Sequence, residues 1–134
     1  MFADPRDIID IYTRGDLLRD GGLVDVTATA REAGFTVPVA LTAAVWADCV
    51  AWTDDDNERK GTIQDEDGRL YDVVWMAAET VRRRGRFGAF VTFQVLRVPR
   101  EGQERDATLV TLEMTIGPGD DGEPVITIAT PGED

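Results

Sequence analysis

The side chains best able to do chemistry are carboxylates, gathered in the polar stretch between residues 53 and 68. Carboxylates this close together could bind Ca²⁺ or Mg²⁺, contact basic side chains of a partner, or act in general acid–base catalysis. An EF-hand calcium loop needs glycine at its sixth position and glutamate at its twelfth, but a loop beginning at Asp54 has Arg59 and Asp65 there. We therefore expect no metal site and interpret the stretch as a solvated acidic loop, with a partner-binding patch as its functional alternative. The acids of this first candidate set are Asp54, Asp55, Asp56, Glu58, Asp65, Glu66 and Asp67.

Residue types that most hydrolytic and zinc enzymes need are missing. The chain has no histidine, no serine and a single cysteine, Cys49. It therefore offers no imidazole base, no serine nucleophile and no intramolecular disulfide. Paired carboxylates alone indicate little, because a chain with 26 acidic residues always brings some of them close together. We expect no catalytic residue and no cofactor, and we interpret Cys49, which lies in an apolar run, as a buried structural thiol.

The charge along the chain is uneven. The formal net charge is −12, yet residues 82–105 contain seven arginines and only two acids. Interleaved phenylalanines such as Phe90 and Phe93 would suit a nucleic-acid-binding surface. Core packing explains the phenylalanines as well, and the net negative charge repels a polyanion at long range. We predict that the arginines serve helix ends and internal ion pairs, without direct contact to nucleic acid.

Two further features add to the acidic patch. Trp52 directly precedes the acids, and we expect this indole to be partly exposed as an interface anchor, with Trp46 and Trp75 in the core. The glycine-rich stretch at 117–123 superficially resembles a phosphate loop, but it lacks the lysine and the following helix that such a loop requires. We predict a hairpin loop there. Its acids, Asp120, Asp121 and Glu123, form the second candidate set for partner binding.

Caps and hydrophobic periodicity predict helices in the first two thirds of the chain. Thr13 can cap a short helix, and Gly34 can end a second one. Pro38 suits the first turn of a third helix, which carries one apolar stripe. The predicted helices span about 13–20, 28–33, 38–50 and 68–84, with an extended stretch at 23–26 and a polar loop at 53–61.

After Gly85 the hydrophobic period changes to two residues, which is typical of strands. The predicted strands cover residues 87–98, 107–116 and 124–129. Three consecutive strands with short connections favour an antiparallel meander, and its apolar face needs a cover. We therefore predict an α+β fold in which N-terminal helices pack on a C-terminal three-stranded antiparallel meander. The chain is predicted to be one domain over 1–134, with 1–11 as a flexible N-terminal segment and 130–134 as a flexible tail.

Several motifs are fairly specific as a set, although each is weak alone: DGGLVDV at 20–26, AGF at 33–35, VPVALTAAVW at 37–46, GRLYDV at 68–73 and GPGDDGEPVITI at 117–128. They resemble an uncharacterised small domain family found in phages, plasmids and integrated elements, and the resemblance spans roughly residues 12 to 134. This family has no activity that could be carried over to a residue here. The resemblance implies a context, that of an accessory protein of a mobile element.

This context and the acidic charge together predict a non-enzymatic inhibitor of a host defence protein, of the anti-CRISPR or anti-restriction type. Such an inhibitor would mimic nucleic acid and bind the basic surface of a nucleic-acid-binding host protein. The embedded basic segment counts against a uniform mimic. The first alternative is a generic protein-interaction module or a homodimer that pairs an exposed edge of the meander. The second is a Mg²⁺-dependent carboxylate enzyme.

The sequence shows no signal for a membrane. No apolar run approaches the roughly 20 residues of a transmembrane helix. The first residues lack the basic start and apolar stretch of a signal peptide. We expect a cytoplasmic protein without a membrane partner.

Overall fold

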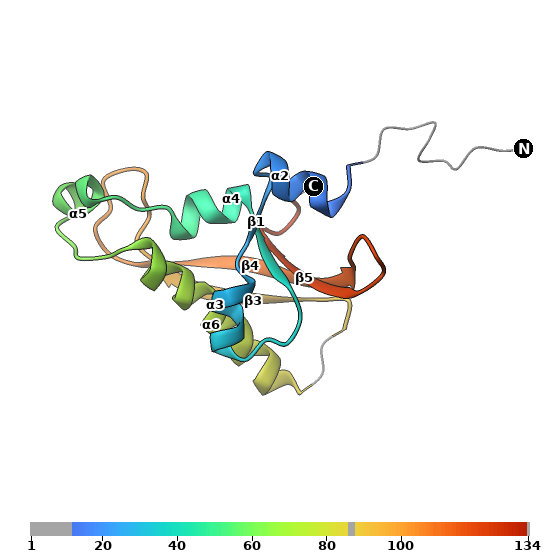
Figure 1. Cartoon of the computed structure of the whole chain (residues 1–134). Coiled ribbons are helices and arrows are strands. Elements are labelled where there is room, and N and C mark those ends of the chain that lie inside the picture. The colour runs from blue at the N-terminus through green and yellow to red at the C-terminus, as the bar shows by residue number, and fades with distance from the viewer. Residues whose placement is uncertain (1–11, 86–87, 134) are drawn as a thin grey trace, which may run out of the picture.

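One mixed sheet organises the fold (Figure 1). The computed structural model describes residues 12–85 and 88–133, and five strands lie within these ranges. The strands are β1 (Leu23–Asp25), β2 (Val39–Thr42), β3 (Phe90–Arg97), β4 (Thr108–Pro118) and β5 (Pro124–Ala129). Their order across the sheet is β1-β2-β5-β4-β3. β2 runs parallel to β5, and every other neighbouring pair is antiparallel.

The predicted three-stranded antiparallel meander is wrong as a description of the sheet. β3, β4 and β5 follow one another as predicted, but β2 pairs with the free side of β5 and β1 extends the sheet further. The sequence predicts one helix over 38–50, whereas its first residues form β2. A short apolar run that is buried on both sides suits a central strand as well as a buried helix, so periodicity could not separate the two. Pro38 precedes the strand, and its carbonyl accepts a hydrogen bond from the Ile126 amide at 2.9 Å.

The helices lie mainly before the strands of the C-terminal half, as predicted. Those expected near 13–20, 28–33 and 68–84 are confirmed, whereas the polar loop expected at 53–61 is wrong because α5 occupies it. None of the helices in residues 12–85 and 88–133 is both long and apolar enough to cross a bilayer. The helices are α2 (Arg14–Asp20), α3 (Thr27–Ala33), α4 (Ala43–Val45), α5 (Asp54–Lys60) and α6 (Glu66–Arg84), and a π-helical turn, η1 (Trp46–Val50), follows α4.

The core lies between one face of the sheet and the neighbouring helices α3 and α6 (Figure 1). Alternate residues of β3 show the division, because Val91, Phe93 and Val95 are buried while Thr92 and Gln94 are exposed. Burial of this apolar face is the main driving force for the fold.

The opposite face of the sheet is covered only in part by α2. The Arg14 guanidinium donates hydrogen bonds to Thr127 Oγ1 at 2.7 Å and to the Ile126 carbonyl at 2.9 Å. Leu23 and Ala40 are buried on this half of the face. On the half formed by β3 and β4, the outward side chains are mostly exposed.

The predicted flexible segment at 1–11 lies outside the described residues. Near the other end, Glu133 accepts hydrogen bonds from Thr42 Oγ1 at 3.0 Å and from the Thr130 amide at 2.9 Å. These bonds connect residues 130–133 to the end of β2.

Candidate functional site

Most of the exposed acids of the first candidate set lie where α5 and α6 begin, and Glu58 lies one turn further along α5. Thr53 and Asp56 form a capping box at the start of α5, and Asp65 caps α6 by accepting a hydrogen bond from the Gly68 amide at 2.7 Å. The positive end of each helix dipole favours acids in these first turns. A hollow of about 320 Å³ lies between them. We call the exposed acids here the acidic end: Asp54, Asp55, Glu58, Asp65, Glu66 and Asp67.

Asp56 belongs to the same stretch of sequence but lies inside the protein. It is only 6% exposed, and its carboxylate accepts hydrogen bonds from Arg59 Nη2 at 2.9 Å and from Arg100 Nε at 2.8 Å. Burial would raise the pKa of Asp56, but the hydrogen bonds from Arg59, Thr53 and Arg100 outweigh it and hold this pKa well below its usual range. In this conformation Asp56 holds α5 in place and has no free surface for a partner.

The expectation that Trp52 is partly exposed is wrong. Trp52 is 5% exposed, its Nε1–H donates to Asn57 Oδ1 at 2.8 Å, and the Arg69 guanidinium lies 4.3 Å from the ring centroid. A cation–π contact and a satisfied indole N–H make burial favourable. Trp46 is half-buried against the core, whereas Trp75, also expected in the core, is 40% exposed on α6.

Basic side chains of α5 hold the loop at 98–107, which connects β3 to β4. Lys60 is almost completely buried, and its ammonium donates to the carbonyls of Glu101, Gly102 and Glu104 at 3.4, 3.1 and 2.6 Å. The Arg59 guanidinium adds hydrogen bonds to two carbonyls of the same loop. The sequence analysis did not predict this helix or its hydrogen bonds to the loop, although the Thr53-x-x-Asp56 spacing is a capping signal.

The second candidate set lies at the opposite end of the molecule from the acidic end (Figure 1). It occupies the turn between β4 and β5. The two Asp120 carboxylate oxygens accept hydrogen bonds from the Arg14 and Gly15 amides, both at 2.9 Å, and so fix the start of α2. Asp121 is exposed and Glu123 is half-buried. The two candidate sets therefore do not form one continuous surface.

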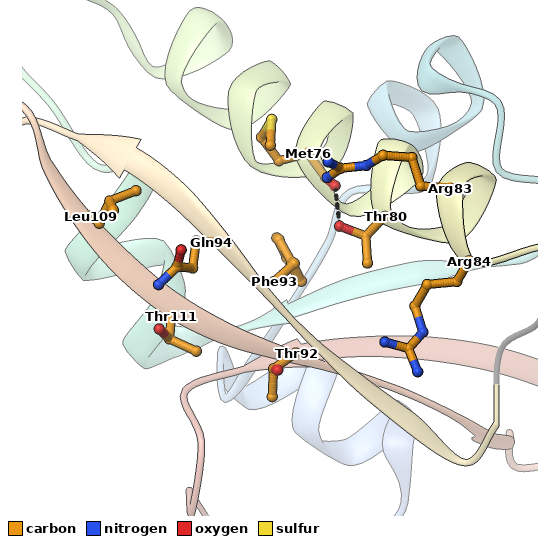
Figure 2. A pocket seen from close by; sticks show the side chains of 9 residues that line it. All are labelled: Met76, Thr80, Arg83, Arg84, Thr92, Phe93, Gln94, Leu109 and Thr111. Carbon is orange, nitrogen blue, oxygen red and sulfur yellow. Dashed lines mark hydrogen bonds between the residues drawn. The ribbon is translucent and has the colours of Figure 1, made fainter.

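A larger hollow runs between α6 and β3, and no prediction from the sequence singled it out (Figure 2). Its main cavity, of about 690 Å³, shares Met76, Gln94 and Leu109 with a neighbouring cavity of about 290 Å³. We call the two together the α6–β3 groove. Figure 2 shows the side chains of α6 on one side of Phe93 and those of Thr92 and Thr111 on the other. The α6 residues that line the groove are Asp72, Trp75, Met76, Thr80, Arg83 and Arg84.

One long side of β3 has no strand beside it in the described part of the chain. The Ala89 carbonyl accepts a hydrogen bond from the Ile116 amide at 3.1 Å, which sets the alternation of the ladder with β4. Every second residue from Ala89 therefore turns its backbone groups toward β4. The outward N–H and C=O groups belong to Phe90, Thr92, Gln94 and Leu96.

Apolar side chains accompany this edge. Phe90 is 58% exposed, and Leu96 is 60% exposed directly opposite Leu109, which is 59% exposed. Large apolar side chains that cluster on a surface often mark an interaction site. The edge of β3 and the groove beside it thus combine unpaired backbone groups with apolar contact area.

The single thiol is confirmed as buried. Cys49 is 1% exposed, and burial, aided by the charge of Asp48, raises its pKa to about 12. A thiol with such a pKa is almost entirely protonated at neutral pH and reacts slowly. Among the described residues, no three acidic or cysteine side chains converge in a way that could hold a metal ion.

Comparison with known families places the chain without assigning it an activity. A family model described as a family of unknown function, DUF6573, matches residues 1–134. The chain belongs to the DUF6573 family. No curated protein and no solved structure matches the chain. The functional argument for this DUF6573 member therefore depends on the chemistry of its own surfaces.

Proposed function

We propose that this DUF6573 member is a non-enzymatic protein-binding module whose binding surface is the α6–β3 groove together with the outward edge of β3. The observation that carries the proposal is an eight-residue edge strand beside an open hollow. An unpaired strand edge offers a row of N–H and C=O groups with which an added strand can pair. Side chains along the groove would then supply specificity.

The two edges of the sheet differ in a way that supports this proposal. β1 is three residues long and ends at the exposed Asp25, and short length and charge are common protections of an edge. β3 is eight residues long and carries no charge before its last residue, Arg97. The Arg97 guanidinium turns inward to Asp48, with a shortest separation of 3.1 Å. Within the described residues, β3 thus lacks the usual protections against pairing.

The side chains around the groove suit binding better than catalysis. Arg83 and Arg84 stay protonated at neutral pH and cannot act as bases. Thr80 already donates its hydroxyl hydrogen to the Met76 carbonyl at 2.9 Å. Asp72 is the only carboxylate that lines the two described cavities of the groove. Guanidinium groups beside apolar side chains match a partner that carries carboxylates and apolar residues.

Photo-crosslinking through a single introduced cysteine would test the module. Cys49 is buried with a raised pKa, so a maleimide photo-crosslinker should react selectively with Thr92→Cys at the edge of β3. The matched control is Thr115→Cys, which is exposed on the same sheet face but belongs to β4. We expect adducts from Thr92→Cys, in host lysate or with the purified protein alone, and few from Thr115→Cys. Equal adducts from both variants, or none from either, would contradict the proposal.

A second candidate function uses the acidic end. Carboxylates from the first turns of two helices line one hollow there, which gives a compact negative surface. Such a surface could bind the basic surface of a nucleic-acid-binding host protein by mimicking phosphates. In this version the protein is a cytoplasmic accessory of a mobile element that inhibits host defence, of the anti-CRISPR or anti-restriction type. Because Asp120, Asp121 and Glu123 lie far from the acidic end, the surface that would mimic phosphates is limited to one end of the molecule.

Charge removal at the acidic end would test this second function. Replacing its six acids with Asn or Gln keeps the N-cap, because Asn caps a helix as well as Asp does. The variant should lose salt-sensitive binding to the host protein, measured by affinity chromatography with a salt gradient. Asp121→Asn/Glu123→Gln at the other end is the control and should bind normally. Unchanged elution of the six-residue variant would exclude this function.

A further inference from the structure

We propose that the partner of the α6–β3 groove is a second copy of this chain, paired antiparallel through β3 and through the flanks of the two α6 helices. This proposal rests on the proposed function of the groove. The contact is isologous, which means that both copies use the same surface around a twofold axis through its middle.

The flank of α6 that borders the groove is graded in charge. Its N-terminal part carries Asp65 and Asp72, its middle carries Met76, and its C-terminal part carries Arg83 and Arg84. Asp65, Asp72, Met76 and Arg83 follow one another at spacings of seven, four and seven residues. Within α6 these spacings place Asp72, Met76 and Arg83 on one face of the helix, and Asp65, the N-cap, directly precedes it. Two other charged residues of this face are engaged within the chain, because Arg69 is buried and Glu79 forms an ion pair with Arg82 at 2.8 Å. The remaining charges of the flank are acidic toward the N-terminus of α6 and basic toward its C-terminus.

Two such flanks match when they run in opposite directions. α6 has 19 residues, and Trp75 is the central one. A twofold axis near Trp75 brings Arg83 of one copy to the part of the other copy that carries Asp65 and Asp72. A parallel arrangement would instead place arginines against arginines. Complementary charges fix the register of an interface, and like charges exclude the alternatives.

The strand supports the same axis. A twofold axis perpendicular to the sheet and through Phe93 pairs the four residues with outward backbone groups, Thr92 with Gln94 and Phe90 with Leu96 of the other copy. Antiparallel pairing of two β3 strands would join both five-stranded sheets into one. Because α6 packs against β3, this pairing also brings the two α6 flanks toward each other. Strand pairing and helix contact are thus parts of a single interface.

The interface would also cover groups that are poorly placed in a single copy. Trp75 is 40% exposed, and Leu96 and Leu109 are each about 60% exposed. Burial raises the pKa of Asp72, and Arg69 opposes that effect. A guanidinium from a second copy would further favour the charged form of this carboxylate. Association therefore shields apolar area and stabilises a partly desolvated charge at the same place.

Charge reversal on each half of the flank, followed by mixing, tests the proposal. Arg83→Glu/Arg84→Glu makes the flank acidic throughout, and Asp72→Arg removes the acid nearest the groove centre. Asp65 stays unchanged because it caps α6. Arg31→Glu/Arg105→Glu, two exposed sites outside the groove, is the control with the same change in net charge as the first variant. The readout is mass by sedimentation velocity over a range of concentrations, with folding checked by circular dichroism.

We expect the wild type and the control to approach twice the 14.7 kDa chain mass. Each groove variant alone should dimerise about 10- to 100-fold more weakly, and an equal mixture of the two should regain dimers. If Asp72→Arg misfolds, Arg83→Glu/Arg84→Glu alone still tests the proposed dimer. Its two arginines make no intramolecular ion pair within the described residues, so their replacement should not disturb the fold. A monomeric wild type, or groove variants that keep the wild-type mass, would overturn the proposal.

Crosslinking separates failure of this inference from failure of the proposed function. If the wild type is monomeric while Thr92→Cys still forms adducts with other proteins, the second copy is excluded and the binding module stands. Self-adducts from Thr92→Cys that disappear in the Arg83→Glu/Arg84→Glu background support the second copy. Absence of every adduct removes both proposals.

Discussion

The acidic end and the α6–β3 groove use charged side chains in opposite ways. Behind the acidic end, two charged side chains of α5 are engaged inside the protein, since Asp56 accepts hydrogen bonds from two arginines and Lys60 donates to loop carbonyls. At the groove, Arg83 and Arg84 are exposed and line the hollow beside β3 (Figure 2), and within the described sheet β3 keeps a free edge. The buried charges of α5 are thus committed to folding, and the groove, which is poorer in charge, is better prepared for binding. Charge density in a sequence is a weak guide to which surface binds a partner.

Removal of Asp56 should have the largest effect on stability, and it tests whether the buried charges of α5 contribute to folding. Asp56→Ala leaves Arg59 and Arg100 without their carboxylate and deletes half of the α5 capping box, so we expect a loss of about 3 kcal/mol in the free energy of unfolding. Asp55→Ala, on the exposed side of the same turn, is the control and should change it by less than about 0.5 kcal/mol. Urea unfolding monitored by tryptophan fluorescence measures both. Similar values for the two variants would mean that Asp56 does not hold α5 in place.

A second variant tests whether the hydrogen bonds from α5 hold the loop at 98–107 in place. Lys60→Met keeps the apolar stem but leaves the loop carbonyls without their donor, and we expect a loss of about 2 kcal/mol. Hydrogen exchange should rise in 98–107 and stay unchanged in β3. If exchange in the loop is the same as in the wild type, Lys60 does not hold it.

The pH dependence of stability sharpens the comparison, because the two regions contain aspartates with opposite pKa shifts. The folded-state pKa of Asp56 lies below its unfolded value of about 3.9, so its contribution is present above about pH 4 and is lost as the pH falls through the folded pKa. The folded-state pKa of Asp72 is raised, mainly by burial, so its contribution is present below the unfolded value and is lost as the pH rises through the folded pKa. Asp56→Asn should therefore lower stability at neutral pH, and Asp72→Asn should raise it slightly.

The measurement is urea unfolding from about pH 3 to pH 7 in the Arg83→Glu/Arg84→Glu background, so that association does not contribute. Shifts of the same sign for both variants would show that the two aspartates do not differ as described.

The smallest effect on stability is expected at the groove. Leu96→Thr/Leu109→Thr removes exposed apolar area, and we expect the free energy of unfolding to change by no more than about 0.5 kcal/mol. The same variant should reduce self-association and Thr92 crosslinking strongly. A large loss of stability with unchanged association would reverse the assignment of the two regions.

The sequence predicted those elements whose signals are local. Thr13 forms the predicted cap of α2, Gly34 ends α3, and the two-residue period of β3 and β4 is present. β2 was missed because Val39–Thr42 continues directly into helical residues without a change in polarity. α5 was missed because a short helix of charged residues has no apolar period, although Thr53, Asp56 and Gly61 mark its two ends.

The groove could not be predicted because it depends on the order of the strands. An isolated meander would leave both β3 and β5 at its edges. In the structure β2 occupies the outer side of β5, so β3 alone remains as a long free edge within the described sheet. That arrangement depends on a parallel contact between segments far apart in the chain, which local patterns do not encode. The lack of charge from Phe90 to Leu96 was the available signal for this edge. The same lack of charge is equally typical of a strand in the middle of a sheet.

Burial of Lys60 also determines how the protein responds to covalent modification. It is the only lysine in the chain, and it is 1% exposed. Acetylation, ubiquitin attachment and amine-reactive labels therefore find no lysine acceptor on the folded surface. They reach Lys60 only when the loop at 98–107 opens. The rate at which this side chain is acylated therefore measures how often that local opening occurs.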